Sequence, residues 1–190
     1  YERNTLYGCI MANLNWKYKV IPKLLNATEI KIAHEYCKER HIKNTDNFDE
    51  VQNNCGDTKF YKDSLMQVFL KSKKKILEKN INLKLHETYT FWRCYTYGAD
   101  LKKHKDRPSC EISVTVFIGS DGEHEWPIYM DGKKVNLTPG DGVIYRGCDI
   151  EHWREPYKGD YHMQVFLHYV DANGKYANHK GDVINENFTE

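Results

Sequence analysis

Two side chains that could bind a metal ion lie close together in the segment from Tyr95 to Asp106. His104 and Asp106 are two residues apart, and side chains two residues apart in an extended strand project to the same face. One imidazole and one carboxylate are therefore expected to point at a common position. They could supply two of the three ligands of a 2-His-1-carboxylate facial triad, which holds Fe(II) and leaves coordination positions free.

The third ligand of such a site should come from later in the chain, and His152 is the best placed of the remaining histidines. It follows residues 135–145, whose sequence is typical of a strand, a turn at Pro139-Gly140 and a second strand. We therefore predict that His104, Asp106 and His152 are the catalytic and metal-binding residues.

The bulk composition limits the classes of protein to be considered. The chain has 190 residues, 40% hydrophobic and 29% charged, which is typical of one globular domain with a substantial core. Its formal net charge is +1, so neither nucleic acid nor a membrane is expected as a partner. Six cysteines show no Cys-x-x-Cys pair, and no apolar run approaches the length of a membrane span. We expect a cytoplasmic protein that is a monomer or a weak homodimer.

The first 80 residues are predicted to form largely helical support. A helix is expected from a cap at Asn26 or Thr28 to about Arg40. A polar loop over 41–57 then leads to a second helix over about 63–79. The apolar face of this second helix is predicted to be built from Leu65, Val68, Phe69 and Ile76.

After Asn80 the hydrophobic period changes to two, which indicates strands. A long strand is predicted over 83–97, with alternate residues from Leu83 to Tyr97 on one face. Asp131-Gly132 is the strongest hairpin signal in the chain. Short strands are expected at 18–21, 112–118, 126–130, 133–137, 142–146, around His152, and at 161–170.

Helices followed by about seven short strands favour a β-sandwich or barrel with helices packed outside. The fold class is therefore mainly β with supporting helices (α+β), with the N-terminal helices outside the β core. We expect a single domain over 1–190, in which 1–80 is the helical support, 81–170 the β core and 171–190 a polar tail.

From about residue 18 to residue 171 the chain resembles the Fe(II)/2-oxoglutarate-dependent dioxygenases, in particular their prolyl 4-hydroxylase-like branch. The resemblance rests on an ordered set of motifs at the family's spacing, following two helices. It implies a double-stranded β-helix, or jelly roll, with the metal inside one mouth. The motifs are Tyr97-Gly98, His104-Lys-Asp106, Leu137-Thr-Pro139-Gly140-Asp141, His152 and the closing strand 161–170.

The chain departs from this family at the residue that anchors the cosubstrate. The family's closing strand supplies an Arg or Lys nine or ten residues after the distal His, where this chain has Tyr161 and His162. A dianion in a nearly dry barrel needs a cation. Arg154 is our candidate, because it lies two residues beyond His152 and so should face the same interior side.

Other residues are assigned supporting roles. His162 and Gln164, alternating inward on the last strand, could add hydrogen bonds to the cosubstrate, as could the hydroxyls of Tyr95 and Tyr97. The reserve cations are Arg107 and Arg146, the second-line metal ligands are His124 and His162, His168 is interpreted as a core or rim histidine, and Trp92, Trp126 and Trp153 as packing residues.

The resemblance implies an enzyme that couples decarboxylation of 2-oxoglutarate to hydroxylation of an unactivated C–H bond. Its cofactors would be Fe(II) and the cosubstrate 2-oxoglutarate, with dioxygen as oxidant and ascorbate as reductant. A peptidyl proline is the suggested substrate, and other peptide or protein side chains, free amino acids and small metabolites are also compatible. Asp106, where halogenating relatives have Gly or Ala, argues against halogenation.

Two other functional classes remain open from the sequence. The first is a cupin-type metal enzyme that does not use 2-oxoglutarate, which the missing cation on the last strand keeps in consideration. The second is a jelly-roll binding module without catalysis, in which His104, Asp106 and His152 would not converge.

Overall fold

The structure, a computed structural model, describes residues 16–42, 57–122 and 124–182. Most of the predicted polar loop at 41–57, all but the last residue of the N-terminal segment before Lys17, and the end of the polar tail lie outside the described residues. No helix within the described ranges is long and apolar enough to cross a membrane.

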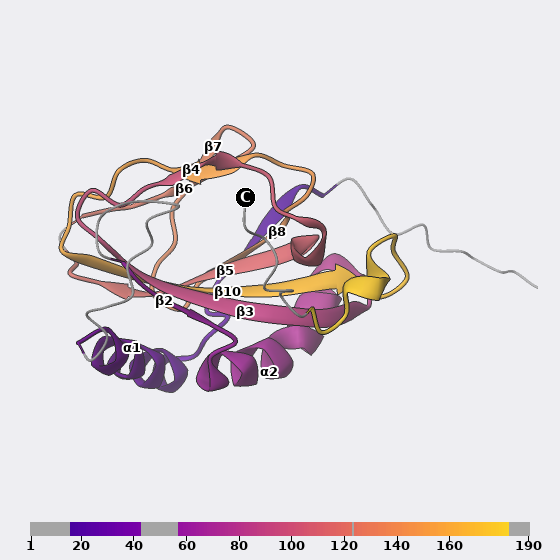
Figure 1. The fold of residues 1–190 in the computed structure, drawn as a ribbon, viewed down its shortest axis with the longest axis horizontal. Helices are drawn as coiled ribbons and strands as arrows, with labels where there is room; N and C mark the ends of the chain where they lie inside the picture. The colour runs from indigo at the N-terminus through magenta and orange to yellow at the C-terminus, as the bar shows by residue number, and fades with distance from the viewer. Residues whose placement is uncertain (1–15, 43–56, 123, 183–190) are drawn as a thin grey trace, which may run out of the picture.

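Two antiparallel sheets face each other, and two helices cover one of them (Figure 1). The larger sheet has the strand order β1-β8-β5-β10-β3-β2, and the smaller has the order β4-β9-β6-β7. This is the predicted double-stranded β-helix with its helices outside. Its elements are β1 (Tyr18–Ile21), α1 (Ala27–Ile42), β2 (Thr58–Tyr61), α2 (Ser64–Ile81), β3 (Leu85–Thr96), β4 (Leu101–His104), β5 (Ile112–Ser120), β6 (Ile128–Met130), β7 (Lys133–Val135), β8 (Gly142–Arg146), β9 (His152–Arg154) and β10 (Tyr161–Asp171), with short 3-10 turns at Pro108–Cys110 and Ala177–His179.

Both helices begin at side chains that cap them. Before α1, the Asn26 side chain accepts from the Glu29 amide (3.0 Å), and Glu29 in turn accepts from the Asn26 amide (2.8 Å), a reciprocal capping box. Asp63 caps α2 by accepting from the amide of Leu65 (3.0 Å). The predicted helix starts are therefore confirmed within one or two residues.

The apolar face predicted for α2 is partly wrong. Val68 is 57% exposed and Ile76 is 45% exposed, whereas Phe69 is buried as predicted. The helix turns a different stripe toward the sheet, spaced three or four residues apart. Lys73 interrupts this stripe, and its ammonium pairs with Glu29 of α1 (2.6 Å). The buried stripe consists of Met66, Phe69, Leu70, Lys73, Leu77 and Ile81.

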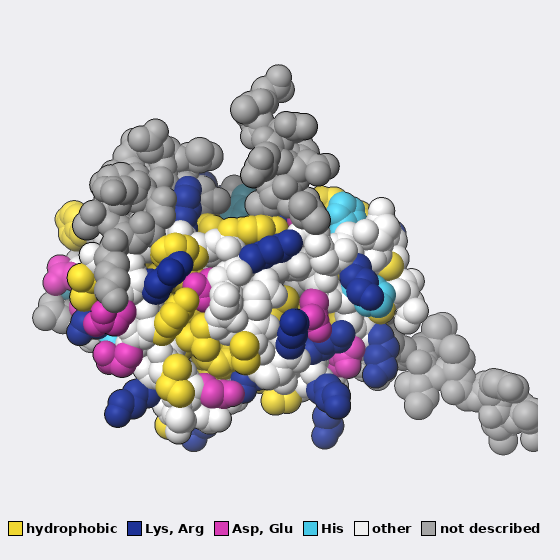
Figure 2. Space-filling model, turned by 60° about the horizontal axis from the view of Figure 1, so that its bottom comes forward, with side chains coloured by type: hydrophobic (Ala, Val, Ile, Leu, Met, Phe, Trp, Pro, Cys, Tyr) yellow, Lys and Arg dark blue, Asp and Glu magenta, His cyan; other side chains and the backbone are white. Residues whose placement is uncertain are grey.

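The outer face formed by the helices carries mixed charge. Figure 2 shows Lys and Arg side chains there interspersed with Asp and Glu and with exposed apolar side chains, rather than gathered into one patch of a single sign. This agrees with a net charge of +1 over the whole chain.

The long strand β3 does not keep one face, contrary to the prediction. Its pairing with β10 shifts by one residue between the pairs Leu167↔Thr90 and Tyr169↔Glu87. An extra residue in one strand reverses which side chains point inward. Leu85 therefore packs in the core under the helices, whereas Phe91 and Tyr95 pack between the two sheets.

The side chains of β10 alternate between these two environments, which creates the polar interior of the barrel. Met163, Val165 and Leu167 belong to the apolar core shared with the helices. The intervening residues turn toward the smaller sheet. They are His162, Gln164, Phe166 and His168.

The hairpin between β6 and β7 forms as predicted. Asp131 and Gly132 both have positive φ, at 51° and 80°, the backbone that a two-residue hairpin loop requires. This hairpin extends the smaller sheet next to β9.

The described part of the predicted polar tail folds back onto the barrel. The Gly181 amide donates to the Glu87 carbonyl (2.8 Å), and Asp182 pairs with Arg107 (2.7 Å). Lys62 donates to the carbonyl of Asp182. These contacts anchor residues 181 and 182 beside the segment that follows β4.

Candidate metal centre

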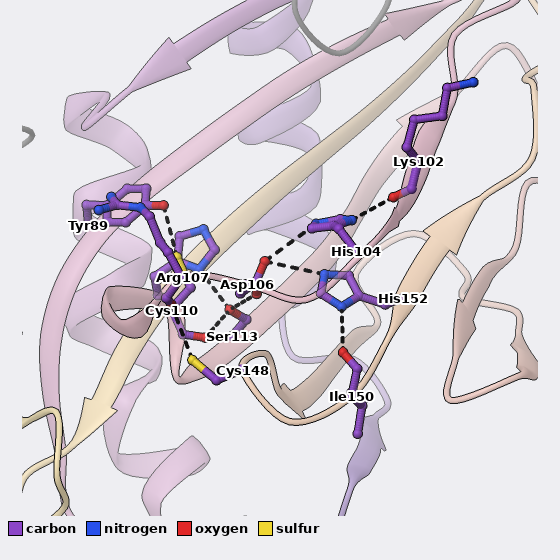
Figure 3. Close-up of polar contacts among 11 residues, drawn as sticks. Tyr89, Lys102, His104, Asp106, Arg107, Cys110, Ser113, Cys148, Ile150 and His152 are labelled. Carbon is purple, nitrogen blue, oxygen red and sulfur yellow. Dashed lines mark hydrogen bonds and ion pairs between the residues drawn. The ribbon is translucent and has the colours of Figure 1, made fainter. Parts of the chain in front are cut away.

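The three residues of the predicted triad converge in the structure (Figure 3). His104 ends β4 and His152 begins β9, and the two residues are direct partners in the antiparallel β4–β9 pair. Asp106 Oδ1 lies 3.6 Å from His104 Nε2 and 3.4 Å from His152 Nε2. The non-catalytic alternative required these side chains not to converge, and it loses its geometric basis.

Asp106 reaches this position from outside the strand on which we expected it. β4 ends at His104, and the Asp106 amide donates to the carbonyl of Gly147 (2.9 Å), which draws the chain inward. A side chain at position 147 would collide with Asp106 and with the Cys110 carbonyl. Gly147 is therefore part of the site, although no sequence motif marks it.

Both imidazoles are held with Nε2 toward Asp106. His104 Nδ1 donates to the Lys102 carbonyl (2.7 Å), and His152 Nδ1 donates to the Ile150 carbonyl (3.3 Å). A neutral imidazole with its proton on Nδ1 presents a lone pair at Nε2, as in metal-binding histidines held by backbone carbonyls. Two lone pairs and a carboxylate that face one another need a cation among them.

The spacing of the donor atoms fits a small divalent ion. Two ligands that each lie about 2.1 Å from one cation are about 3.0 Å apart at right angles and about 3.4 Å apart at the tetrahedral angle. The separations of 3.4 and 3.6 Å at Asp106 are close to this range. Two imidazoles and one carboxylate match the non-haem Fe(II) triad.

The electrostatics of the site favour an ionised carboxylate. Burial alone would raise the pKa of Asp106, but hydrogen bonds with His104 and His152 and the nearby charges of His152 and His168 hold its pKa far below the ordinary value. Burial opposes protonation of His104, yet its hydrogen bonds to Asp106 and to the Lys102 carbonyl outweigh burial and raise its pKa. In the metal-free protein, a proton on His104 thus supplies the positive charge beside Asp106.

Access to the site is one-sided. The His152 side chain is 2% exposed, Asp106 is 13% exposed and His104 is 37% exposed. A ligand would therefore approach the centre past His104.

Two residues further along β9, Arg154 lies on the same face of the strand as His152, as predicted. Arg154 is 3% exposed, donates through Nη1 to the Trp126 carbonyl, and stacks over the Trp126 ring at 4.7 Å. With the Gln164 amide in its favourable orientation, its oxygen accepts from Arg154 Nη2 (2.9 Å) and His162 Nε2 (2.6 Å). The same amide donates to Thr115 Oγ1 (2.7 Å), which fixes the group in place.

The charge of Arg154 has no anionic partner among the described residues, where its acceptors are a backbone carbonyl and a neutral amide. Within the described ranges, its Nε and the Nδ1 of His162 have no hydrogen-bond partner. Burial lowers the pKa of Arg154 to about 10, so the guanidinium stays charged at neutral pH. A buried cation without a counter-charge is costly, and the arrangement fits an anionic ligand.

A cavity adjoins this group. Its volume is about 770 Å³, within the size range of small-molecule sites. Arg154, His162 and Gln164 form part of its wall, together with Phe117 and Trp126. The cupin-type alternative rested on the absence of an Arg or Lys from the last strand; β10 indeed has neither, but Arg154 of β9 places a cation at the wall of this cavity.

The structure separates the other predicted site residues. Tyr95 is buried between the sheets, edge-on to Trp126 (4.8 Å). Tyr97 is 71% exposed beyond the end of β3, so it is not brought into the barrel. The reserve cations Arg107 and Arg146 are paired with Asp182 (2.7 Å) and Asp149 (2.6 Å).

Four remaining predictions concern one histidine and three tryptophans. His124 is exposed at the rim of the cavity and is not near the triad. Trp92 packs in the core under the helices, and Trp153 stacks on Tyr129 (5.1 Å). Trp126 does more than pack, since it holds Arg154.

Ser113, near the centre, escaped the sequence-based prediction, and His168, interpreted as a core or rim histidine, is buried as expected but also takes part in this cluster. Ser113 of β5 donates to Asp106 Oδ2 (2.9 Å), and His168 of β10 lies 2.9 Å from the Ser113 hydroxyl. The alternation of polar and apolar residues along β10 was the available signal, because it places His168 on the same face as His162 and Gln164.

No model of a known protein family matches the chain, and no curated protein matches it. Solved structures do match. A prolyl 4-hydroxylase from Pseudomonas putida is 15% identical, with a TM-score of 0.66 over 83% of this chain and 94% of that one. The viral collagen prolyl hydroxylase of Paramecium bursaria Chlorella virus-1, as its 2-oxoglutarate complex, is 12% identical, with a TM-score of 0.61 over 82% and 96% of the two chains.

The same fold also supports other reactions. The α-ketoglutarate-dependent epimerase of nogalamycin biosynthesis is 11% identical, with a TM-score of 0.66 over 82% of this chain and 78% of that one. The chain thus has the fold of 2-oxoglutarate-dependent oxygenases, shared among hydroxylases, an epimerase and a carbocyclase.

Proposed function

We propose that the chain is an Fe(II)- and 2-oxoglutarate-dependent oxygenase that hydroxylates an unactivated C–H bond. In this reaction one atom of dioxygen enters the product and the other enters succinate, while 2-oxoglutarate loses carbon dioxide. The observation that carries the proposal is the convergence of three ligand atoms. His104 Nε2 lies 3.6 Å and His152 Nε2 lies 3.4 Å from Asp106 Oδ1.

The protein's own part at this centre is to hold and orient. Iron, when bound, would supply the oxidising chemistry. His104 and His152 would bind it through Nε2, since backbone carbonyls hold both Nδ1 protons. Asp106 would contribute negative charge, and three ligands from the protein would leave positions for the cosubstrate and dioxygen.

Arg154 is proposed to bind the distal carboxylate of 2-oxoglutarate. It follows His152 by two residues, a rise of about 7 Å along a strand, and its guanidinium has no carboxylate partner among the described residues. Gln164 accepts from the guanidinium and from His162, and both residues line the adjoining cavity. Tyr95 is the remaining candidate for a cosubstrate contact, because it is buried between the sheets.

The substrate is proposed to be a peptide or protein side chain, with a prolyl residue as the first candidate. Support comes from the likeness to two prolyl hydroxylases and from the exposed His104 edge, which leaves the centre open to a large substrate. Small molecules are the second candidate, because the fold also belongs to an epimerase of nogalamycin biosynthesis. Ascorbate is proposed as the reductant.

The test is turnover of 2-oxoglutarate by the purified protein. With Fe(II), ascorbate and dioxygen we expect succinate and carbon dioxide in equal amounts, at a rate that rises when a proline-containing peptide library is added. Mass spectrometry would then locate a gain of one oxygen atom on the substrate. Absence of succinate from metal-loaded protein would contradict the proposal.

A further inference from the structure

The two oxygens of Asp106 have separate partners. Oδ1 faces the two imidazoles, whereas Oδ2 accepts a hydrogen bond from Ser113 Oγ at 2.9 Å (Figure 3). Ser113 is completely buried on β5. The carboxylate is therefore held from behind by the barrel wall, as well as facing the metal position.

A second residue stands behind Ser113. His168 of β10 is the direct strand partner of Ser113, and its Nδ1 lies 2.9 Å from Ser113 Oγ. Its ring packs against Tyr89 at 4.5 Å and is parallel to Phe166 at 6.3 Å, which restricts its rotation. The imidazole thus has a fixed plane and a fixed partner.

The number of available hydrogens fixes the direction of the hydrogen bonds that join His168, Ser113 and Asp106. The Ser113 hydroxyl has one hydrogen, and its possible acceptors include the Asp106 carboxylate (2.9 Å) and the Cys110 carbonyl (3.0 Å). The charged carboxylate is the stronger acceptor. Ser113 therefore donates to Asp106, and His168 donates from Nδ1 to Ser113.

We propose that Ser113 and His168 are positioning residues that keep Asp106 a one-oxygen ligand. Oδ2 is committed to Ser113, so only Oδ1 is offered to the metal. A carboxylate that bound through both oxygens would occupy one more coordination position, which the cosubstrate and dioxygen need. This inference rests on the proposed metal site, and it names the residues that fix how many positions remain open there.

A different use of the same residues is conceivable. Asp106, Cys110 and His168 offer three ligand atoms within 4.8 Å of one another, and a sulfur, nitrogen and oxygen set suits zinc. These donors already have partners in the protein, since Ser113 bonds to Asp106 and His168 and the Cys110 thiol contacts the Tyr89 hydroxyl at 3.0 Å. We therefore favour positioning over a second cation.

The first test is titration of the full chain with Co(II), followed by visible absorption. We expect Ser113→Ala to weaken Co(II) binding by about 10- to 100-fold, as is usual when a residue behind a ligand is removed, and to change the ligand-field spectrum. Ser113→Thr, which keeps the hydroxyl, should restore both. Thr115→Ala is the matched control, because Thr115 lies two residues along the same strand but bonds to Gln164. It should leave Co(II) affinity and spectrum unchanged.

The second test separates the hydrogen bond of His168 from its packing. His168→Phe keeps a ring against Tyr89 and removes the donor, whereas His168→Asn keeps a donor near the Nδ1 position. We expect the Phe variant to reproduce the effect of Ser113→Ala and the Asn variant to recover part of the wild-type affinity. This pair carries the test if thermal unfolding shows that Ser113→Ala does not fold.

Two results would overturn the inference. One is wild-type Co(II) affinity and spectrum in both Ser113→Ala and His168→Phe. The other is a thiolate-to-cobalt absorption band that disappears in Cys110→Ser, which would assign the cluster to a metal. Failure of the wild-type chain to bind Co(II) at all is a separate result, and it would remove the proposed function together with this inference.

Discussion

The two ends of the barrel interior are opposites in charge. At the outer end, an ionised Asp106 faces His104 and His152 and is supported by Ser113. At the other end, Arg154 is only 3% exposed, and its acceptors are a backbone carbonyl and an amide. One end presents an anion that needs a cation, and the other presents a cation that needs an anion.

This contrast indicates what the interior is built to hold. A proton on His104 can satisfy Asp106 in the apo protein, because hydrogen bonds to Asp106 and to the Lys102 carbonyl raise the pKa of that imidazole. No such substitute exists for Arg154, whose pKa of about 10 keeps it charged. A divalent metal bound at Asp106 and a dicarboxylate that reaches Arg154 would together neutralise both buried charges. A metal alone or an anion alone would neutralise only one of them.

The largest effect is expected when the anion of the metal end, Asp106, is removed. We expect Asp106→Ala to lower Fe(II) affinity and succinate formation by more than about 100-fold, because losing a ligand should exceed the loss of about 10- to 100-fold seen for residues behind ligands. Metal analysis after dialysis and a succinate assay provide the measurement. Undiminished turnover in this variant would end the iron assignment.

Removing the cation at the other end should separate binding from stability. Arg154→Met is expected to weaken 2-oxoglutarate binding to the Co(II)-loaded protein by about 30-fold or more, since truncating one partner of a buried charge pair costs about 2–5 kcal/mol. The apo protein should be no less stable, because an uncompensated buried charge is removed.

Calorimetry and thermal unfolding would report both effects of Arg154→Met. Arg146→Met is the matched control, because that guanidinium is paired with Asp149 outside the barrel, and it should bind 2-oxoglutarate as the wild type does. Unchanged affinity in Arg154→Met would show that the cosubstrate is anchored elsewhere.

The pH dependence of the free energy of unfolding should reveal the buried, neutral state of His168 near the metal end. Burial lowers the pKa of His168 from 6.5 to about 4, so between these values the unfolded chain binds a proton that the folded chain does not. The stability contributed by neutral His168 is therefore present above pH 6.5 and declines as pH falls toward 4. We expect a loss of about 2 kcal/mol between pH 7.5 and pH 5 from this residue.

The contribution of His168 is the difference between the free energies of unfolding of two proteins. Urea unfolding of the metal-free wild type and of His168→Phe at several pH values isolates it, because all other groups titrate in both proteins. Parallel pH profiles for the two proteins would refute it.

The smallest effect is expected at the residue that the fold leaves outside both ends. Tyr97 is 71% exposed, so Tyr97→Ala should leave the KM for 2-oxoglutarate and the metal affinity unchanged. A steady-state assay checks this. A raised KM would show that the barrel closes over its cosubstrate in a way that brings Tyr97 inward.

The sequence was most informative where chemistry depends on short spacing. His152 and Arg154 are two residues apart on one strand, so local backbone geometry put both on the same interior face, as predicted. The hairpin at Asp131-Gly132 and the cap at Asn26 were predictable for the same reason. His104 and Asp106 are also two residues apart, but Asp106 reaches the site through the bond of its amide to the Gly147 carbonyl.

Features that depend on contacts between distant strands could not be predicted in this way. Ser113 reaches Asp106 and His168 only because β5 and β10 pair in one particular register. The register shift in β3 reversed the faces of half a strand, and no residue in the sequence announces it. The exposed position of Val68 likewise follows from how α2 is rotated against the sheet.

The pairing of His104 with His152 across β4 and β9 has a consequence for local motion. Both strands are short, with four and three residues, so this edge of the smaller sheet should be among the first parts of the barrel to open. Any such opening separates the two imidazoles. Bound metal would then hold β4 and β9 together, because it binds only when the two imidazoles are close. Amide hydrogen exchange in β4 and β9 should therefore slow when metal is added, while exchange in β10 stays the same.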